Sequence, residues 1–439
     1  MMYAQLSNIL DLVADEDQEV AALMAAENIR QSENLPLIPS ENIVSTAVAA
    51  ALSSCFTNKY AEGYPHLWKE GKKVEANGRY YQGQANTNAL EKLVINRALQ
   101  LFCDNNNPED YHANVQALSG APANLAVLSA FLNPGDTFMG LALDNGGHLT
   151  HGHKVNITGK IYRAVQYGLT DEGLLDYDAI EELAKKEHPK VIVCGATAYP
   201  LTIDFERFGK IAKSVGALLL ADISHIAGLC VAGVHPNPFP HADIVTTTTH
   251  KTLRGPRAGL IICKKALGQQ IDKALFPGLQ GGPHMNTIAA LAVALKEALD
   301  PSFKTYARQI VSNAIALAED LKQAGFKLIG NGTQNHLILM DVRHSKPEVC
   351  VPDASQLAEQ LERAHIVANK NAVPGDLKPW IPSGIRLGTP AVTTLGMKEA
   401  EMHQIAAFIT RATQHWQDDA ELDKIGAEVK AFMVPFVQG

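Results

Sequence analysis

Short apolar runs alternate with amphipathic stretches through the middle of the chain. Four of these runs are predicted to be buried strands, namely residues 190–196, 217–222, 244–248 and 259–263. A helical pattern over Phe208–Val215 separates the first two. Strands joined by helical crossovers are typical of a parallel sheet covered by helices. The middle of the chain is therefore predicted to be a large α/β domain.

The two ends of the chain follow other patterns. The first 45 residues predict a helical arm that ends in a turn at Pro36–Pro39. A helical pattern from Asn286 breaks near Pro301, and a second one runs over Phe303–Gly325. Apolar runs at 327–330, 336–342 and 383–389, with a helix at 354–364, then predict a smaller α+β unit. We predict three parts with boundaries 1–45, 46–300 and 301–439.

Composition narrows the classes of function. The chain has 439 residues, a formal net charge of −8 and no long basic block, so we expect no nucleic-acid partner. Its six cysteines form no CxxC pair, which is typical of buried thiols in a reducing compartment. No apolar run reaches the ~18 residues of a membrane span. The acidic, amphipathic N-terminus differs from a targeting segment. We expect a cytoplasmic protein with no membrane partner.

Two strand ends carry candidate chemistry. Lys251 closes the run TTTTHK after the strand at 244–248, and Asp222 ends the run ALLLAD. Each has an ordinary explanation when taken alone. Lys251 could be a surface lysine whose aliphatic stem packs on apolar neighbours. Asp222 could cap a helix that follows the strand. Ligands bind at the carboxyl ends of strands in α/β sheets. A lysine there can form a Schiff base with an aldehyde cofactor, and a carboxylate can pair with a protonated pyridine nitrogen. The pair is therefore more specific than either residue.

Two further segments fit a phosphorylated, flat cofactor. Ser119-Gly120-Ala121-Pro122 opens a predicted helix, and a small-residue turn at a helix N-terminus can hold a phosphate, although a plain helix start is also compatible. The segment GGHLTHGH contains His148, His151 and His153, and three histidines this close in sequence suggest a possible metal site. The spacing departs from HExxH, so we expect no metal and favour an imidazole stacked on the cofactor ring.

Several motifs together resemble the serine hydroxymethyltransferase family, over about residues 15–410. They are TNKYAEGYP (57–65), GRYY (78–81), GGHLTHG (146–152), TTTTHKTLRGPR (246–257), QGGP (280–283) and SGIRLGTPA (383–391). The resemblance implies a fold-type I enzyme dependent on pyridoxal 5′-phosphate, with a large, mainly parallel domain and a smaller α+β domain. It also implies a homodimer or dimer of dimers with shared active sites.

The resemblance also implies the residues that hold the cofactor. Lys251 would form the covalent aldimine, Asp222 would pair with the pyridine nitrogen, and His148 would stack on the ring. Tyr60, Gly281 and Gly282 would reach the phosphate of the neighbouring subunit. The full cofactor-binding set is Lys251, Asp222, His225, His148, Ser119, Gly120, Ala121, Thr197, His250, Tyr60, Gly281 and Gly282.

The reaction implied is the reversible conversion of L-serine and tetrahydrofolate to glycine and 5,10-methylenetetrahydrofolate. Arg386 would bind the amino-acid carboxylate through its guanidinium fork. Glu62 would move the proton of the substrate hydroxyl and of the folate. The implied catalytic residues are Lys251, Glu62, His148, Asp222 and Tyr80. The implied substrate-binding residues are Arg386, Ser40, Tyr80, Tyr81, Glu62, Leu149 and Asn371.

The chain departs from the family pattern in two places near the expected folate entrance. Residues 66–77 (HLWKEGKKVEAN) are extra, and Asn88 stands where the family carries an acidic residue. An alternative is therefore a related enzyme acting on α-methylserine or another β-hydroxy amino acid. Three interpretations of the extra segment stay open: a solvated surface loop, a packing element at the subunit interface anchored by Trp68, and a lysine cluster that attracts the glutamate tail of folates.

Overall fold

A computed structural model describes residues 7–103, 106–376 and 381–437. The chain divides into two compact units, residues 47–307 in one and residues 1–46 with 308–439 in the other. The three-part division expected from the sequence stays a prediction, and residues 1–6 of its arm lie outside the described residues. No helix in the described ranges combines the length and apolar character that crossing a membrane requires.

A seven-stranded sheet forms the centre of the unit 47–307, in the order β6-β12-β11-β10-β9-β7-β8. The four runs predicted to be strands form β9 to β12, so this prediction is confirmed. The strands are β6 (Tyr111–Asn114), β7 (Thr137–Leu141), β8 (Arg163–Tyr167), β9 (Val191–Cys194), β10 (Leu218–Asp222), β11 (Ile244–Thr248) and β12 (Gly259–Lys264).

One strand of this sheet runs against the others. β12 pairs antiparallel with both β11 and β6, whereas the neighbours from β11 to β8 pair in parallel. The segment 249–258 between β11 and β12 contains no helix, and a parallel return needs a longer crossover. The carboxyl ends of the other six strands consequently lie at one edge of the sheet.

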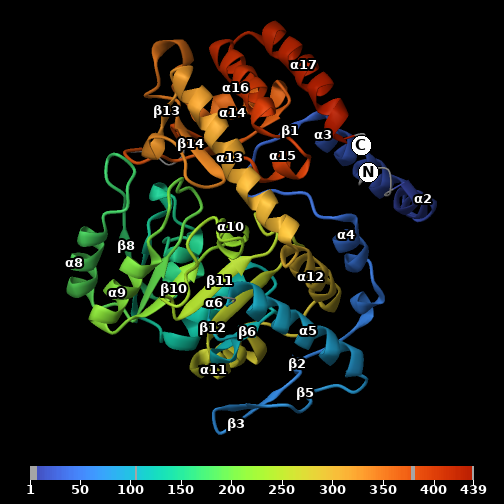
Figure 1. The fold of residues 1–439 in the computed structure, drawn as a ribbon, viewed down its shortest axis with the longest axis vertical. Helices are drawn as coiled ribbons and strands as arrows, with labels where there is room; N and C mark the ends of the chain where they lie inside the picture. The colour runs from blue at the N-terminus through green and yellow to red at the C-terminus, as the bar shows by residue number, and fades with distance from the viewer. Residues whose placement is uncertain (1–6, 104–105, 377–380, 438–439) are drawn as a thin grey trace. The chain divides into compact units, whose positions relative to one another are not determined.

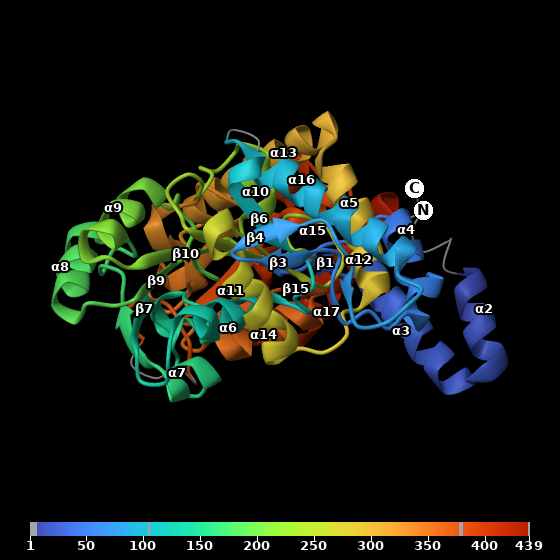
Figure 2. The same cartoon turned by 90° about the horizontal axis from the view of Figure 1, so that it is seen from below.

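Helices cover this sheet. In Figure 2, α6 and α11 lie on one side of the strands, with α5 and α10 on the other. Buried residues of α6 such as Val127 and Leu128 join strand residues Val193 and Ile261 in one apolar cluster. The helices of this unit are α4 (Thr46–Leu52), α5 (Ala85–Phe102), α6 (Gly120–Phe131), α7 (Ile157–Ile161), α8 (Tyr177–Glu187), α9 (Phe205–Val215), α10 (Ala227–Val231), α11 (Gly268–Lys273) and α12 (Met285–Ala298).

The other unit joins both ends of the chain. Its antiparallel sheet has the order β13-β14-β17-β16, formed by Lys327–Leu328, Leu337–Asp341, Gly384–Gly388 and Asn369–Asn371. The N-terminal segment contributes β1 (Leu35–Pro36), which pairs with β15 (Ile366–Val367) and lies among the C-terminal elements in Figure 1. Its helices are α2 (Ser7–Glu16), α3 (Gln18–Glu33), α14 (Ala354–Arg363), α15 (Pro390–Thr394), α16 (Glu399–Gln414) and α17 (Asp419–Val437), while α13 (Pro301–Gln323) spans both units.

The extra segment 66–77 folds into a hairpin. Strands β3 (Leu67–Lys69) and β4 (Lys72–Val74) pair antiparallel. The flanking strands β2 (Gly63–Tyr64) and β5 (Gly78–Arg79) also pair, so the hairpin grows from a second short ladder. Glu70 and Gly71 form its turn, both with positive φ. Part of the segment is thus ordered by strand pairing.

Candidate active site

Candidate residues gather at the carboxyl edge of the central sheet. Asp222 is the last residue of β10, and Thr197 and Lys251 follow the ends of β9 and β11. Parallel pairing places Asp222 opposite Thr246 and Ala221 opposite Cys194. The strand ends that the sequence predicted to share one edge therefore do so.

Asp222 is buried and receives hydrogen bonds on both carboxylate oxygens. Asn124 and His151 lie 2.7 and 3.1 Å from Oδ2, and the Ser224 hydroxyl lies 2.6 Å from Oδ1. Burial alone would raise the pKa of this carboxyl. The hydrogen bond and charge of His151, with the bond from Ser224, instead hold its pKa well below the usual range. Asp222 is thus a buried, ionised carboxylate at neutral pH.

Sequence reasoning missed the residues that hold this carboxylate. Asn124 lies on α6 and also accepts a 2.6 Å hydrogen bond from the hydroxyl of Thr246. An amide side chain in the largely apolar helix GAPANLAVLSAF was the available signal, because buried polar groups need partners. The sequence suggests His151 only as a metal ligand, whereas in the structure its Nε2 lies 3.1 Å from Oδ2 of Asp222.

The small-residue turn precedes a helix as predicted. Ser119 is the N-cap of α6, and its side chain makes no capping hydrogen bond. Gly120 is buried, and a Cβ there would lie 2.7 Å from Cγ2 of Thr248 and 3.5 Å from Oγ of Ser224. Ala121 follows in the first turn of the helix and is exposed. The helix therefore presents uncapped N–H groups at a place where only a glycine fits, and such N–H groups attract an anion.

Three candidate histidines lie on loops after strands of this sheet. His148 is half-buried, and its Nδ1 lies 2.7 Å from the hydroxyl of Thr150. Burial lowers the pKa of His148 to about 4 and that of His250 to about 3. His225 is buried, and its carbonyl accepts a 2.9 Å hydrogen bond from Thr252. His148 and His250 are therefore neutral at neutral pH.

Thr197 joins the β9 loop to the segment that carries His148. Its hydroxyl lies 3.2 Å from the carbonyl of Gly146 and 3.1 Å from that of Gly147. These contacts hold the loop after β9 beside the loop after β7. Leu149, a predicted folate contact in the same segment, is 40% exposed and thus available to a ligand.

Glu62 lies among tyrosines. The hydroxyl of Tyr60 donates to Oε1 of Glu62 at 3.3 Å, and the rings of Tyr60 and Tyr81 meet edge-to-face at 5.1 Å. Tyr80 packs its ring 5.5 Å from that of Phe276. The tyrosines remain largely exposed, with 57% of Tyr60, 68% of Tyr80 and 44% of Tyr81 accessible. The predicted acid/base residue and tyrosine pair thus form one open cluster.

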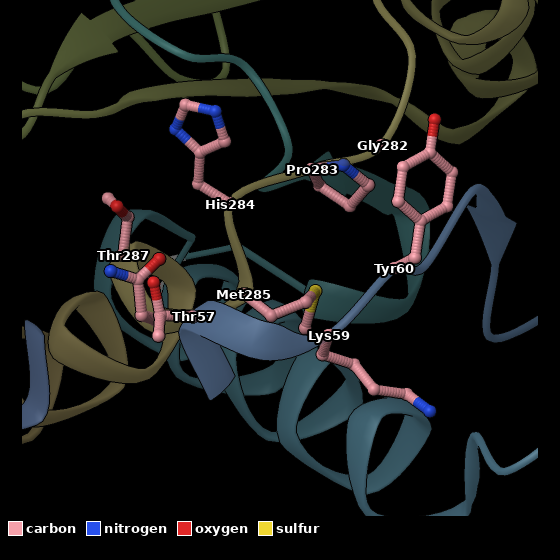
Figure 3. A pocket seen from close by; sticks show the side chains of 9 residues that line it. Thr57, Lys59, Tyr60, Gly282, Pro283, His284, Met285 and Thr287 are labelled. Carbon is pink, nitrogen blue, oxygen red and sulfur yellow. The ribbon is translucent and has the colours of Figure 1, made fainter. Parts of the chain in front are cut away.

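An open pocket of about 480 Å³ adjoins this cluster. Figure 3 shows Tyr60 facing the segment Gly282–Pro283, while Lys59 points away from it. A Cβ at Gly282 would lie 3.6 Å from the Tyr60 ring, and one at Gly281 would lie 3.3 Å from Oε1 of Glu62. The structure therefore brings together Tyr60, Gly281 and Gly282, while their predicted contact with the phosphate of a neighbouring subunit stays a prediction.

The remaining predicted residues belong to the unit built from the chain ends. Arg386 lies on β17 and donates from Nε to Oδ1 of Asn369 at 3.1 Å. Burial lowers the pKa of Arg386 to about 10, so the guanidinium stays charged at neutral pH. Asn371 lies on the neighbouring strand β16, opposite Gly384. Ser40 lies half-buried in the turn after β1.

A second buried polar cluster, which we call the Asp272 hub, was not predicted. Four N–H groups point at the Asp272 carboxylate: His66 at 2.9 Å and Trp68 at 2.8 Å from Oδ2, His112 and Asn114 each at 2.8 Å from Oδ1. Because the acceptor is a carboxylate, both imidazoles donate through Nε2. The hub anchors the extra segment on β6 and α11 of its own chain through His66 and Trp68. A packing role of this segment at the subunit interface stays a prediction.

The Asp272 hub also has the residue types of a metal site. His66, His112 and Asp272 are a group of suitable ligands among the residues that the structure describes. A metal bound through both Nε2 atoms would move each ring proton to Nδ1. Both Nδ1 atoms are buried with no hydrogen-bond partner within the described part of the chain. Metal-binding histidines normally donate that proton to an acceptor, so the hub fits a hydrogen-bonded anchor better than a metal centre.

Comparison with known proteins identifies the family. The family model described as "Serine hydroxymethyltransferase" matches residues 13–409. The chain belongs to the serine hydroxymethyltransferase family. Proteins of that name are 47% identical in Desulfotalea psychrophila (99% of this chain, 98% of the relative), 53% in Acidothermus cellulolyticus (90% and 88%) and 50% in Myxococcus xanthus (97% of both). The predicted family and the fold-type I class are confirmed.

Serine hydroxymethyltransferases depend on pyridoxal 5′-phosphate, and the site fits that cofactor. An ionised carboxylate held by Asn124, His151 and Ser224 suits a protonated pyridine nitrogen. The uncapped start of α6, where a Cβ at Gly120 would clash, suits a phosphate. The buried acid and the anion cradle are linked directly, because Asn124 lies on the helix that begins at Gly120.

Proposed function

We propose that the chain interconverts L-serine and glycine, with tetrahydrofolate as the one-carbon acceptor and pyridoxal 5′-phosphate as cofactor. The observation that carries this proposal is the buried, ionised Asp222 beside the anion cradle of α6, at the strand edge that also carries Lys251. The names of the relatives favour this reaction over the alternative on α-methylserine.

The cofactor would be held by residues from several strand ends. Lys251 would bind it covalently, and Ser119, Gly120 and Ala121 would receive its phosphate at the start of α6. Asp222 would keep the pyridine nitrogen protonated, because its own pKa lies well below neutrality. When bound, the cofactor supplies an electron-accepting ring that stabilises negative charge at the substrate Cα. The further cofactor contacts that we propose are His148, Thr197, His225, His250, Tyr60, Gly281 and Gly282.

The chain's own side chains would bind substrate and move protons. Arg386 would receive the amino-acid carboxylate, with Ser40 assisting, since a charged guanidinium fork matches a planar carboxylate. Glu62 would take the proton of the serine hydroxyl and return it during transfer to the folate. Tyr80 and Tyr81 would orient the substrate, and Leu149 and Asn371 would contact the folate.

Two properties of the whole molecule are also proposed. Tyr60 is 57% exposed beside Gly282, which suits phosphate contacts made to a neighbouring subunit. We propose a homodimer, or a dimer of such dimers, with shared active sites. The absence of a CxxC pair and the buried thiols of Cys194, Cys230 and Cys263 agree with a reducing cytoplasm.

The test is glycine formation from serine with and without tetrahydrofolate, on protein loaded with pyridoxal 5′-phosphate. We expect rapid glycine formation only when the folate is present. Lys251→Ala should abolish turnover, and borohydride should no longer fix the cofactor to the chain. Lys264→Ala is the matched control, because Lys264 pairs with Asp243 on the surface. Equal turnover of serine without folate, or a preference for α-methylserine, would overturn the proposal.

A further inference from the structure

Three consecutive backbone carbonyls around Glu62 are bound by two adjacent residues. Nη1 of Arg79 donates to the carbonyls of Ala61 and Gly63, each at 2.7 Å. The backbone N–H of Tyr80 donates to the carbonyl of Glu62 itself at 3.1 Å. The Arg79 guanidinium thus binds the carbonyls on both sides of Glu62, and the N–H of Tyr80 binds the carbonyl of Glu62 itself.

Arg79 is itself held on its other side. It is 7% exposed, and its Nη2 forms an ion pair with Glu91, a residue of α5 that is 1% exposed. Gln116 donates to Oε1 of Glu91 at 2.8 Å and to the carbonyl of Gly63 at 2.9 Å. The orientation of the guanidinium is therefore set by buried partners on α5 and after β6, both elements of the same unit as Glu62.

Asn88 connects Arg79 to the extra segment 66–77 by hydrogen bonds. Nε of Arg79 donates to Oδ1 of Asn88 at 2.9 Å, and Nδ2 of Asn88 donates to Oδ1 of Asn77 at 3.1 Å. Oδ1 of Asn77 also accepts the backbone N–H of Arg79 at 3.2 Å. An aspartate at 88 would face the oxygen of Asn77 with another oxygen. Asparagine at position 88, where the family carries an acidic residue, is thus suited to hydrogen-bond with Asn77, the last residue of the extra segment.

We propose that Arg79 is a positioning residue for Glu62, fixed in place by Glu91 and by the Asn88–Asn77 link. This inference rests on the proposed function, in which Glu62 moves a proton during one-carbon transfer. Only an arginine carries enough N–H groups, in a fixed planar arrangement, to bind two carbonyls and two side chains at once. A lysine keeps the charge and loses that geometry, so Arg79→Lys isolates positioning from charge.

The alternative is that Arg79 only stabilises the fold. Small misplacements of a catalytic group slow a reaction by up to about 10²-fold, whereas a loss of global stability leaves the folded fraction fully active. A double-mutant cycle with Glu62→Gln separates the two explanations. When Arg79 acts through Glu62, its substitution has little further effect once the carboxylate is gone.

The experiment measures kcat and KM of the folate-dependent reaction for wild type, Arg79→Lys, Glu62→Gln and the double variant, each loaded with cofactor. We expect Arg79→Lys to lower kcat by about tenfold or more and to change the KM for serine by less than about twofold. In the Glu62→Gln background the same substitution should change kcat by less than about twofold. Effects of Arg79→Lys that multiply fully in the double variant would overturn the inference.

A control substitution and a second variant distinguish loss of positioning from a general effect on the protein. Arg163→Lys changes an exposed arginine that pairs with Glu187, and it should leave kcat unchanged. If Arg79→Lys does not fold, the cycle is run with Asn88→Asp, which alters only the support of the guanidinium. Additive effects in that cycle would equally reject positioning. A wild-type protein that makes no glycine from serine would refute the proposed function, whereas an active wild type with multiplicative effects would refute only the role of Arg79.

Discussion

The indole of Trp68 donates from Nε1 to Oδ2 of Asp272 at 2.8 Å, although the two residues are 204 positions apart in the chain. The carboxylate is buried, and burial alone would raise its pKa. The charges and hydrogen bonds of His112 and His66 instead hold the pKa of Asp272 well below its usual range. An ionised carboxylate that is cut off from water depends on every donor it receives.

Replacing Trp68 by phenylalanine tests this anchor. Trp68→Phe keeps a ring in the packing but removes one donor from a buried carboxylate oxygen. We expect the free energy of unfolding to fall by about 1–3 kcal/mol, measured by urea denaturation. Leu67→Ala is the control, since Leu67 is the exposed neighbour on β3 and should change stability by about 0.5 kcal/mol or less. Equal effects of the two substitutions would argue against the anchor.

The sequence predicted those parts of the fold that depend on local patterns. The runs at 217–222 and 244–248 have strand length and apolar character, so the sheet edge with Asp222 and Lys251 followed from them. The direction of β12 did not follow from its own residues, because it depends on the helix-free connection before it. Local sequence patterns determine whether a segment forms a helix or a strand. The direction in which a strand pairs depends on the length and structure of the connection that precedes it.

The Asp272 hub was beyond prediction for the same physical reason. Asp272 lies on α11, His112 on β6 and Trp68 in the extra hairpin, and no periodicity in the sequence links these segments. The support of Glu62 by Arg79 was likewise hidden, since it runs through backbone carbonyls that carry no signature in the side chains. Motif comparison finds the residues that touch ligands, and it misses those that hold them.

Arg386 provides the second prediction. Its guanidinium is charged and half-buried, and a bound carboxylate would gain charge-assisted hydrogen bonds from it. Arg386→Ala should cost about 2–4 kcal/mol of serine binding, measured as a rise of about 30-fold or more in KM for serine, with cofactor content unchanged. Asn369→Ala removes only the acceptor of Nε and should raise KM less. An unchanged KM for serine in Arg386→Ala would show that Arg386 does not bind the substrate carboxylate.

The third prediction concerns acid stability and His235. This imidazole is buried and neutral: Nδ1 donates to the carbonyl of Pro236 at 3.1 Å, and Nε2 accepts the N–H of Ile203 at 3.3 Å. Burial lowers its pKa to about 4. In the unfolded chain the pKa is about 6.5. Protons then bind the unfolded state preferentially below pH 6.5, so the stabilising contribution is complete above that pH and is lost as the pH falls toward 4.

The size of this loss can be measured by difference. Between pH 6.5 and 4 it amounts to about 3 kcal/mol for one histidine. His235→Gln cannot titrate, so the stability gap between wild type and variant should shrink by about that amount over this range. Denaturation curves at several pH values give the gap, and His241→Gln, at an exposed position, serves as control. A gap that stays constant with pH would contradict the assignment.

The last prediction concerns the lysines of the hairpin. Pairing of β3 with β4 places Lys69 opposite Lys72 and Trp68 opposite Lys73. Lys73 therefore shares the face of the anchoring Trp68, and burial lowers its pKa. Lys69 and Lys72 are exposed, and neither forms an ion pair among the described residues. Like charges directly opposite each other on a ladder are destabilising, so an anionic ligand would relieve their repulsion.

The glutamate tail of cellular folates is such an anion, and our hypothesis is that the Lys69–Lys72 pair attracts it. The double variant Lys69→Ala/Lys72→Ala should raise the KM for polyglutamyl tetrahydrofolate about threefold and leave that for the monoglutamate unchanged. The effect should fade with added salt, because exposed charges are screened over ~10 Å at 0.1 M. Lys185→Ala/Lys186→Ala on α8 makes the same change in net charge at a distant exposed site and serves as control. Equal changes for both folates, or the same change in the control, would show that the hairpin does not bind the tail.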